Sequence, residues 1–298
     1  MAPYPTKVYL NGEILDAEQA KISVFDRGFL FGDGVYEVMT QTGGSFFYQH
    51  LHFKRLTESL AKTNIHFEVN TLPSKIEQLL AASDLTNQDC LLYLQITRGI
   101  APRKHAYPAE AVPSLMMYAL PKVFPDINEH QVSVVTLPDY RWMRCDIKMI
   151  SMLGNVMANS YAMEEEAHEA LLIRDGKITE ASHSNVFFVK DEVVYTHPAN
   201  EYILNGITRQ LTVKLCHDLE IEIVEEAVPA TKINNMDEVF LTGTSSLIIS
   251  AKYVDQHQFY SSRACGPITR RLQKGFRDLR VQHRQKSVSP STINSPTI

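Results

Sequence analysis

The chain has 298 residues, of which 44% are hydrophobic and 21% charged, and its formal net charge is −5 at pH 7. This length exceeds that of a usual single domain, so we expect two domains, and the composition is that of an ordinary globular protein. The negative charge argues against a general attraction to nucleic acid or to an anionic membrane surface.

The sequence shows no sign of a membrane or secretory segment. No apolar run approaches about 18 residues, and the N-terminal stretch MAPYPTKVYLNG lacks the apolar core of a signal peptide. We therefore expect a cytoplasmic protein. Four scattered cysteines without a Cys-x-x-Cys pair predict buried thiols instead of disulfides or a zinc site. No HExxH motif is present, and His50 with His52 is too small a pattern to predict a metal ion.

The first third of the chain alternates short apolar runs with turn signals. KVYLNGEILD predicts a hairpin about Asn11-Gly12, and GVYEVMTQTGGSFFY predicts a second about Gly43-Gly44. Apolar residues at helical spacing follow from His50, and LPSKIEQLLAAS begins with a proline suited to a first helical turn. With two further strands, CLLYLQITRG and PSLMMYALP, this predicts an N-terminal α/β domain over residues 1–120.

A polar, proline-bearing stretch, PKVFPDINEH, predicts an interdomain linker over residues 121–133. We expect a C-terminal domain over 134–284 and, because its composition is rich in Ser, Thr and Pro, a disordered tail over 285–298. The expected elements of the second domain are a strand QVSVVTL, a helix from Asn155 to His168, hairpins about Asp175-Gly176 and Asp191-Glu192, a helix from NGITRQLTVKL, strands EIEIVEEAV and EVFLTG, and a helix from Pro267 to Arg284.

The last helix carries six basic residues between Arg270 and Arg284, a pattern that also occurs in nucleic-acid-binding proteins. The helical spacing of Leu272, Phe276 and Leu279 and the acidic balance of the chain favour an amphipathic surface helix instead.

One lysine occupies an unusual place. From Ile147 to Ala158 the chain reads IKMISMLGNVMA, and Lys148 is its only charge. Burying an ammonium without a partner costs several kcal/mol or forces it to deprotonate. A desolvated lysine is a nucleophile that forms a Schiff base with a carbonyl. The alternative is that the side chain extends from a strand end to water.

A carbonyl cofactor held by Lys148 needs an anion site for its phosphate and a counter-charge for its ring, and pyridoxal 5'-phosphate has these demands. LNGITR places Ile207 and Thr208 at the start of a helical pattern, where free backbone N–H groups favour an anion. LTGTSS supplies Thr244, and Arg55 in HFKRL offers a bidentate guanidinium. Each feature alone is equally typical of a helix cap.

Glu180, in KITEASHSNVF, lies 32 residues after Lys148 at the end of a predicted hairpin strand. A carboxylate beside a pyridine nitrogen keeps that nitrogen protonated and strengthens the ring as an electron sink. The alternative is an exposed glutamate at a strand end.

Together these residues carry a resemblance to a known family. The chain resembles the fold-type IV pyridoxal-phosphate enzymes, and most closely the D-amino-acid aminotransferases, also called D-alanine aminotransferases. The matching segments run in family order and are DRGFLFGDGVYEV (26–38), HFKRL (52–56), TRGIAPRKHAYP (97–108), RWMRCDIKMISMLGNV (141–156), ITEASHSNVF (178–187), YTHPANEYILNGITR (195–209) and LTGTSS (241–246).

The resemblance implies a two-domain α+β fold. In it, a smaller N-terminal α/β domain meets a larger C-terminal domain of mostly antiparallel, barrel-like β structure, and the cofactor lies at their interface. Lys148 would form the Schiff base and shuttle the proton, and Glu180 would contact the pyridine nitrogen. The implied phosphate-binding residues are Arg55, Ile207, Thr208 and Thr244.

The resemblance also implies a site for the substrate α-carboxylate. Tyr36 would contribute to it together with Arg103 and His105, which would reach over from the neighbouring subunit of a homodimer. This Arg-x-His pattern resembles the D-amino-acid enzymes, because branched-chain L-aminotransferases and aminodeoxychorismate lyases arrange their carboxylate sites differently.

The implied activity is transamination from a D-amino acid such as D-alanine to 2-oxoglutarate, which yields pyruvate and D-glutamate with ping-pong kinetics. The alternatives are a branched-chain L-aminotransferase, an aminodeoxychorismate lyase, or a non-enzymatic binding protein on the same scaffold. Three positions depart from the family pattern: His183 and Ala181 replace a serine and a glycine of the motif EGSSSN, and Gly243 replaces a serine of the phosphate turn. These changes affect hydrogen bonds around the site and leave Lys148 and Glu180 in place.

Overall fold

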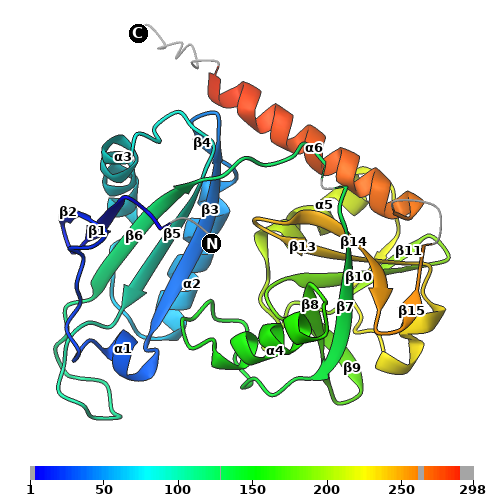
Figure 1. Cartoon of the computed structure of the whole chain (residues 1–298), viewed down its shortest axis with the longest axis horizontal. Helices are drawn as coiled ribbons and strands as arrows, with labels where there is room; N and C mark the ends of the chain where they lie inside the picture. The colour runs from blue at the N-terminus through cyan, green and yellow to red at the C-terminus, as the bar shows by residue number, and fades with distance from the viewer. Residues whose placement is uncertain (1–3, 128, 261–264, 289–298) are drawn as a thin grey trace, which may run out of the picture.

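The computed structural model describes residues 4–127, 129–260 and 265–288. Two lobes, each built on one β-sheet, lie side by side (Figure 1). The first sheet uses strands between residues 7 and 121, and the second uses strands between 131 and 258. The domain boundaries expected from the sequence are consistent with this division and stay a prediction.

The first lobe is a six-stranded antiparallel sheet in the order β2-β1-β6-β5-β3-β4. Both expected hairpins are present, because Asn11, Gly12, Gly43 and Gly44 adopt the positive φ angles that tight turns require. Its elements are β1 (Lys7–Leu10), β2 (Glu13–Asp16), α1 (Arg27–Phe31), β3 (Gly34–Thr42), β4 (Ser45–Phe46), α2 (Gln49–Lys62), η1 (Val69–Thr71), α3 (Leu72–Ala82), β5 (Cys90–Thr97) and β6 (Ser114–Pro121).

The second lobe is a mixed, mostly antiparallel sheet in the order β12-β11-β10-β13-β14-β7-β8-β9, with β15 paired to β14. The strand β9, at one end of this order, contacts β10 near the other end, so the sheet curls on itself. Its strands are β7 (Gln131–Pro138), β8 (Glu169–Arg174), β9 (Lys177–Ala181), β10 (Asn185–Lys190), β11 (Val193–Thr196), β12 (Ile223–Val224), β13 (Glu238–Gly243), β14 (Leu247–Val254) and β15 (His257–Gln258).

The helices of the second lobe cover the sheet and join the lobes. They are α4 (Leu153–Glu164), α5 (Ile207–Asp218), η2 (Ala230–Asn235) and α6 (Pro267–Val288). Leu272 and Phe276 of α6 pack with Leu215 of α5 in one core, which confirms the amphipathic helix expected there. The helix α6 also lies across both lobes (Figure 1), and its His283 contacts the carbonyl oxygen of Phe46 at 2.9 Å.

Several elements differ from the expectation. The helix α4 ends at Glu164, before His168, and α6 runs to Val288, four residues beyond the expected end at Arg284. The remainder of the expected disordered tail, 289–298, lies outside the described residues. The strand β14, in the middle of the second sheet, was not predicted, because its apolar run LIISA lacks the alternation that marks a half-buried strand.

Two expectations about the chain as a whole are met within the described part. All four cysteines are buried and none forms a disulfide. No helix in the described ranges is long and apolar enough to cross a membrane.

Candidate active site

Lys148 lies in an extended segment that crosses between the lobes. Ile147 and Met149 are 5% and 8% exposed and pack in the core of the first lobe. Met149 pairs with Val35, and the N–H of Tyr36 donates to the carbonyl of Lys148 at 2.9 Å. Side chains of an extended segment alternate in direction. The apolar neighbours of Lys148 therefore anchor the segment in the first lobe, and the lysine faces the opposite side.

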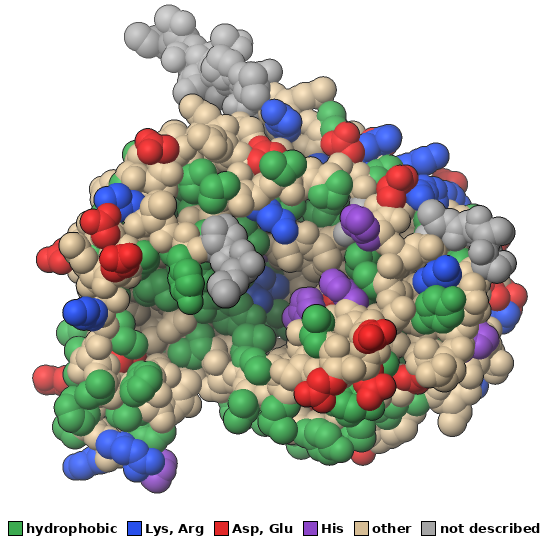
Figure 2. Space-filling view, viewed as in Figure 1, with side chains coloured by type: hydrophobic (Ala, Val, Ile, Leu, Met, Phe, Trp, Pro, Cys, Tyr) green, Lys and Arg blue, Asp and Glu red, His purple; other side chains and the backbone are tan. Residues whose placement is uncertain are grey.

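That side is a cavity of about 570 Å³ between the lobes. Tyr36 of the first lobe and Glu180 of the second lobe line it together with Lys148. The Lys148 ammonium lies 4.0 Å from the centre of the Tyr36 ring. Figure 2 shows that the surface of the molecule is hollowed between the two lobes. The fold thus brings together three residues that are widely separated in the sequence.

Glu180 ends β9 and is 5% exposed. Its Oε1 accepts from Arg141 at 2.6 Å, and its Oε2 accepts from the Asn185 side chain and the Leu204 backbone N–H, each at 3.0 Å. Burial raises the pKa of Glu180, and the Arg141 guanidinium opposes this shift. Glu180 is therefore a buried and oriented carboxyl group at the cavity wall, and the reading of an exposed strand-end residue is wrong.

Arg141 was not predicted as part of the site. Asp139 accepts from the Nε and Nη2 atoms of Arg141 at 2.9 and 3.0 Å, and Arg141 uses its Nη1 for Glu180. Arg174 also reaches Asp139, at 3.2 Å. Asp139 thereby holds the guanidinium that orients Glu180. The sequence signal was weak, because charged residues between two domains are usually solvated.

The expected phosphate-binding residues gather at the start of α5. Ile207, Thr208 and Thr244 line one small cavity, and Gly206 caps the helix without a side-chain hydrogen bond. The first N–H groups of a helix have no partner within the helix and favour an anion. A Cβ on Gly206 would lie 2.3 Å from the Oδ1 of Asn185. Only glycine therefore lets α5 begin this close to the asparagine that also holds Glu180.

Arg55 is fixed by a carboxylate that the sequence analysis missed. Its Nε and Nη2 donate to the two oxygens of Glu37 at 2.7 and 2.8 Å, and its Nη1 donates to the carbonyl of Asn205 at 3.4 Å. His52 contacts Glu37 at 2.9 Å. Burial acts to raise the pKa of Glu37, but Arg55 and His52 outweigh it and lower the pKa to about 2. Arg55 therefore stands beside the start of α5, as expected for a phosphate ligand.

Glu37 carried the same sequence signal as Lys148. It is the single charge in the apolar strand GVYEVM, and such a charge needs a buried partner. Burial, and secondarily the charges of Arg55 and Lys148, lower the pKa of His52, although Glu37 opposes this.

The structure does not bring Arg103 and His105 to Lys148 within one chain. Both are exposed on the loop after β5. The guanidinium of Arg103 lies 5.2 Å from the ring centre of Phe31, and the ring of His105 lies 5.8 Å from it. Phe31 itself lines the Lys148 cavity, but neither of the two loop residues does.

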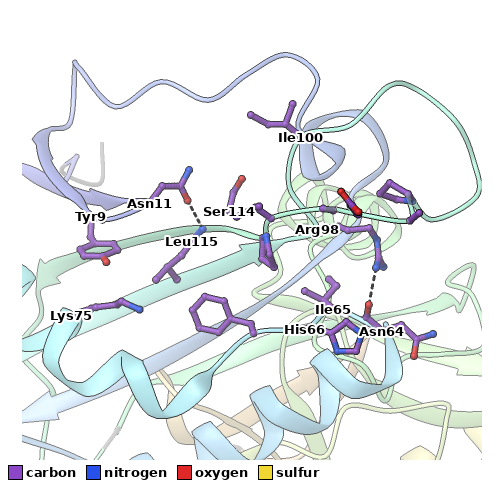
Figure 3. Close-up of a pocket in the computed structure, with 18 residues that line it drawn as sticks. Tyr9, Asn11, Asn64, Ile65, His66, Lys75, Arg98, Ile100, Ser114 and Leu115 are labelled. Carbon is purple, nitrogen blue, oxygen red and sulfur yellow. Dashed lines mark hydrogen bonds between the residues drawn. The ribbon is translucent and has the colours of Figure 1, made fainter.

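A larger cavity, of about 990 Å³, lies in the first lobe (Figure 3). Its lining includes Tyr9, Lys75 and Arg98 but none of the predicted site residues. The Arg98 guanidinium is already used, because it donates to both oxygens of Asp33 and to the carbonyl of Asn64. Size alone therefore does not identify the active site, and the smaller cavity with Lys148 and Glu180 carries the chemistry.

The residues present fit pyridoxal 5'-phosphate. An amine and a buried carboxyl group share one cavity wall. An uncapped helix start with two threonines lies next to the asparagine that holds the carboxyl group. These groups match the aldehyde, the ring nitrogen and the phosphate of that cofactor.

Known proteins resemble this chain along most of its length. The family described as Amino-transferase class IV matches residues 34–254. D-alanine aminotransferase of Staphylococcus haemolyticus is 39% identical over 275 residues, which cover 91% of this chain and 96% of that protein. D-alanine aminotransferase of Bacillus licheniformis is 39% identical over 285 residues, which cover 95% of this chain and 100% of that protein.

Solved structures resemble the chain in fold. Branched-chain aminotransferase from Thermoproteus uzoniensis with norvaline has a TM-score of 0.85 at 23% identity and covers 96% of this chain and 98% of its own. A branched-chain amino acid aminotransferase solved with pyridoxamine 5'-phosphate, from the organism abbreviated T.th., has a TM-score of 0.82 at 22% identity, with 92% and 93% coverage. At these identities the likeness concerns the fold alone, and it confirms the predicted two-domain α+β class.

Proposed function

Because the chain belongs to the class IV aminotransferases, which depend on pyridoxal phosphate, we propose that it transfers the amino group of D-amino acids such as D-alanine to 2-oxoglutarate. The products are pyruvate and D-glutamate. The observation that carries this proposal is the 39% identity to D-alanine aminotransferases across nearly the whole of both chains. The cytoplasmic location remains an expectation from the sequence.

Pyridoxal phosphate supplies an aldehyde for the amino group and a ring that accepts the electron pair released with the α-proton. In our proposal Lys148 first holds the cofactor and then, as a free amine, removes the α-proton and returns it on the other side of the exchange. Glu180 keeps the ring nitrogen protonated. The start of α5, with Thr208, Thr244 and the nearby Arg55, holds the phosphate.

We assign the substrate carboxylate to Tyr36 and to Arg103 and His105 of a second subunit. Support for a homodimer comes from the exposed apolar side chains on both lobes. Phe29 and Ile100 of the first lobe are 67% and 57% exposed, and Leu153 and Met157 of α4 are 71% and 62% exposed. Figure 2 shows hydrophobic side chains gathered along the lower edge of both lobes. Large exposed apolar surfaces mark interfaces between proteins.

The substrate assignment is tested by initial rates with D-alanine and with L-leucine, each with 2-oxoglutarate as acceptor. We expect turnover with D-alanine and at least about a hundredfold lower kcat/KM with L-leucine, since only one enantiomer presents its α-hydrogen to Lys148. Preference for L-leucine would support the branched-chain activity, whose names appear among the structural neighbours. Release of pyruvate without an amino acceptor would indicate a lyase.

The shared site is tested by co-expressing Lys148→Ala and Arg103→Ala subunits. If Arg103 acts across the interface, each mixed dimer has one intact site, and roughly a quarter of the wild-type activity returns. If Arg103 serves its own chain, no site in the mixed dimer is intact, and the mixture stays as inactive as the two parents.

A further inference from the structure

We propose that His168, Glu169 and His183 form a binding site for a divalent transition metal ion, with Zn²⁺ as the best fit. The ligand atoms of these three side chains lie within 4.8 Å of one another. The Nε2 of His183 lies 3.2 Å and the Nε2 of His168 lies 3.9 Å from the Oε1 of Glu169. Two imidazoles and one carboxylate are a common donor set for zinc.

The backbone of the second lobe holds these residues together. Glu169 is the first residue of β8, and His183 lies in the turn between β9 and β10. The β8–β9 hairpin folds the chain back, and the N–H of His183 donates to the Oε2 of Glu169 at 2.9 Å. The N–H of His168 donates to the carbonyl of Ser133 at 2.7 Å, which fixes the backbone of the third ligand.

Glu169 differs from the two other buried glutamates of the site region. It is 0% exposed, yet within the described ranges its only ion-pairing neighbours are the two imidazoles. Glu37 and Glu180 each have an arginine instead. A buried carboxylate without a permanent cation is costly. A metal ion bound between the imidazoles would supply the missing positive charge.

His168 adds an independent observation. Its Nε2 is shielded from solvent and has no hydrogen-bond partner among the described residues. Burial lowers the pKa of His168, and the neighbouring His183 lowers it further, although Glu169 opposes both. The neutral imidazole that results has a lone pair to offer, and neutral imidazole is the form that binds metal.

The spacing suits zinc after a small adjustment. Ligand atoms of a tetrahedral zinc site with bonds near 2.0 Å are roughly 3.3 Å apart. The His183–Glu169 separation of 3.2 Å already matches, and the His168–Glu169 separation of 3.9 Å is slightly longer. Both imidazoles are partly exposed, 38% and 46%, so their rings can turn toward a shared ion.

The position of the site ties it to the active-site cavity. His183 lines the cavity that contains Lys148 and Glu180. A zinc site with three protein ligands keeps a fourth position for water. The bound ion would therefore lie at the wall of the catalytic cavity. His183 stands where the family pattern has a small serine, so the site is a feature of this chain.

The test is calorimetric titration of the metal-free holoenzyme with Zn²⁺. We expect one ion per chain with a dissociation constant of about 10 µM or below. The variants His183→Ser and His168→Gln should each weaken binding at least tenfold, since each removes one of three ligands. The control His66→Asn, an exposed histidine of the first lobe, should bind as the wild type does. No uptake by the wild type, or unchanged affinity in either ligand variant, would overturn the proposal.

Zinc K-edge absorption spectroscopy of the loaded protein gives a second, structural readout. The expected spectrum has two imidazoles and one further oxygen shell at about 2.0–2.2 Å, without sulfur. A sulfur ligand would place the ion at a cysteine and refute the site. Neither measurement depends on turnover, so a failed D-alanine assay and a failed zinc titration are separate results.

Discussion

Two glutamates flank the catalytic cavity from opposite lobes, and both are buried, but their environments shift their pKa values in opposite directions. Glu37, in the first lobe, gives both oxygens to Arg55 and one also to His52, and its pKa falls to about 2. Glu180, in the second lobe, receives a single guanidinium N–H from Arg141, and burial raises its pKa. The number of charged donors, and not the depth of burial, decides which carboxyl group stays fixed and which remains available for chemistry.

This comparison separates a structural role in the first lobe from a chemical role in the second. Glu37 does not line the Lys148 cavity, whereas Glu180 does. Substitutions in the two lobes should therefore affect different measurements.

The largest effect is expected at Lys148, which stands between the two carboxyl groups. Lys148→Ala should lower the initial rate of D-alanine transamination by at least about 10³-fold, since it removes both the nucleophile and the base. The rate is measured with 2-oxoglutarate in excess. Borohydride reduction of the wild-type holoenzyme followed by peptide mapping should locate the cofactor on Lys148. Labelling of a different lysine would contradict the whole assignment.

The next effect tests the structural side. Glu37→Gln should lower the free energy of unfolding by about 3–5 kcal/mol, because it leaves the buried Arg55 without its anion. Urea denaturation followed by circular dichroism measures this change. Glu13→Gln, at an exposed position in β2, is the matched control and should change stability by less than about 0.5 kcal/mol. Equal stability of both variants would show that the Arg55 ion pair is not structural.

The chemical side is tested by Glu180→Gln. An amide cannot keep the ring nitrogen protonated, so kcat should fall about 10²-fold. Stability should change less than in Glu37→Gln, because Arg141 keeps Asp139 as its partner. Steady-state kinetics and urea denaturation on the same preparation give both numbers. A variant that lost stability but kept its kcat would reverse the roles assigned to the two glutamates.

The smallest effect is a pH dependence. The pKa of Glu37 is lower in the folded chain, at about 2, than its ordinary value of 4.5. The stabilisation from its ionised form is therefore complete above pH 4.5 and is lost as the pH falls toward 2. Between pH 5 and pH 3 the stability advantage of the wild type over Glu37→Gln should shrink by about 2 kcal/mol. A constant difference across this range would show that Glu37 has an ordinary pKa.

Much of the local structure was readable from the sequence. The hairpins about Asn11-Gly12 and Gly43-Gly44 follow from turn residues that tolerate positive φ angles, and α2 and α3 follow from helical spacing of apolar residues. These signals act over a few residues, so tertiary contacts do not have to confirm them. The strand β14 escaped prediction because its burial comes from neighbours far away in the chain.

By itself, the sequence determined which residues carry the chemistry: Lys148 as a lone charge in an apolar run, Glu180, and the glycine-led helix start at Ile207. Only the tertiary structure decided their surroundings. It pairs Arg55 with Glu37, puts Arg141 on Glu180, and leaves Arg103 and His105 away from the Lys148 cavity. It also brings His168 and His183 to one carboxylate, although no linear metal motif joins them. The physical reason is that partners of buried charges are set by chain folding over long separations, whereas turns and helices are set by neighbouring residues.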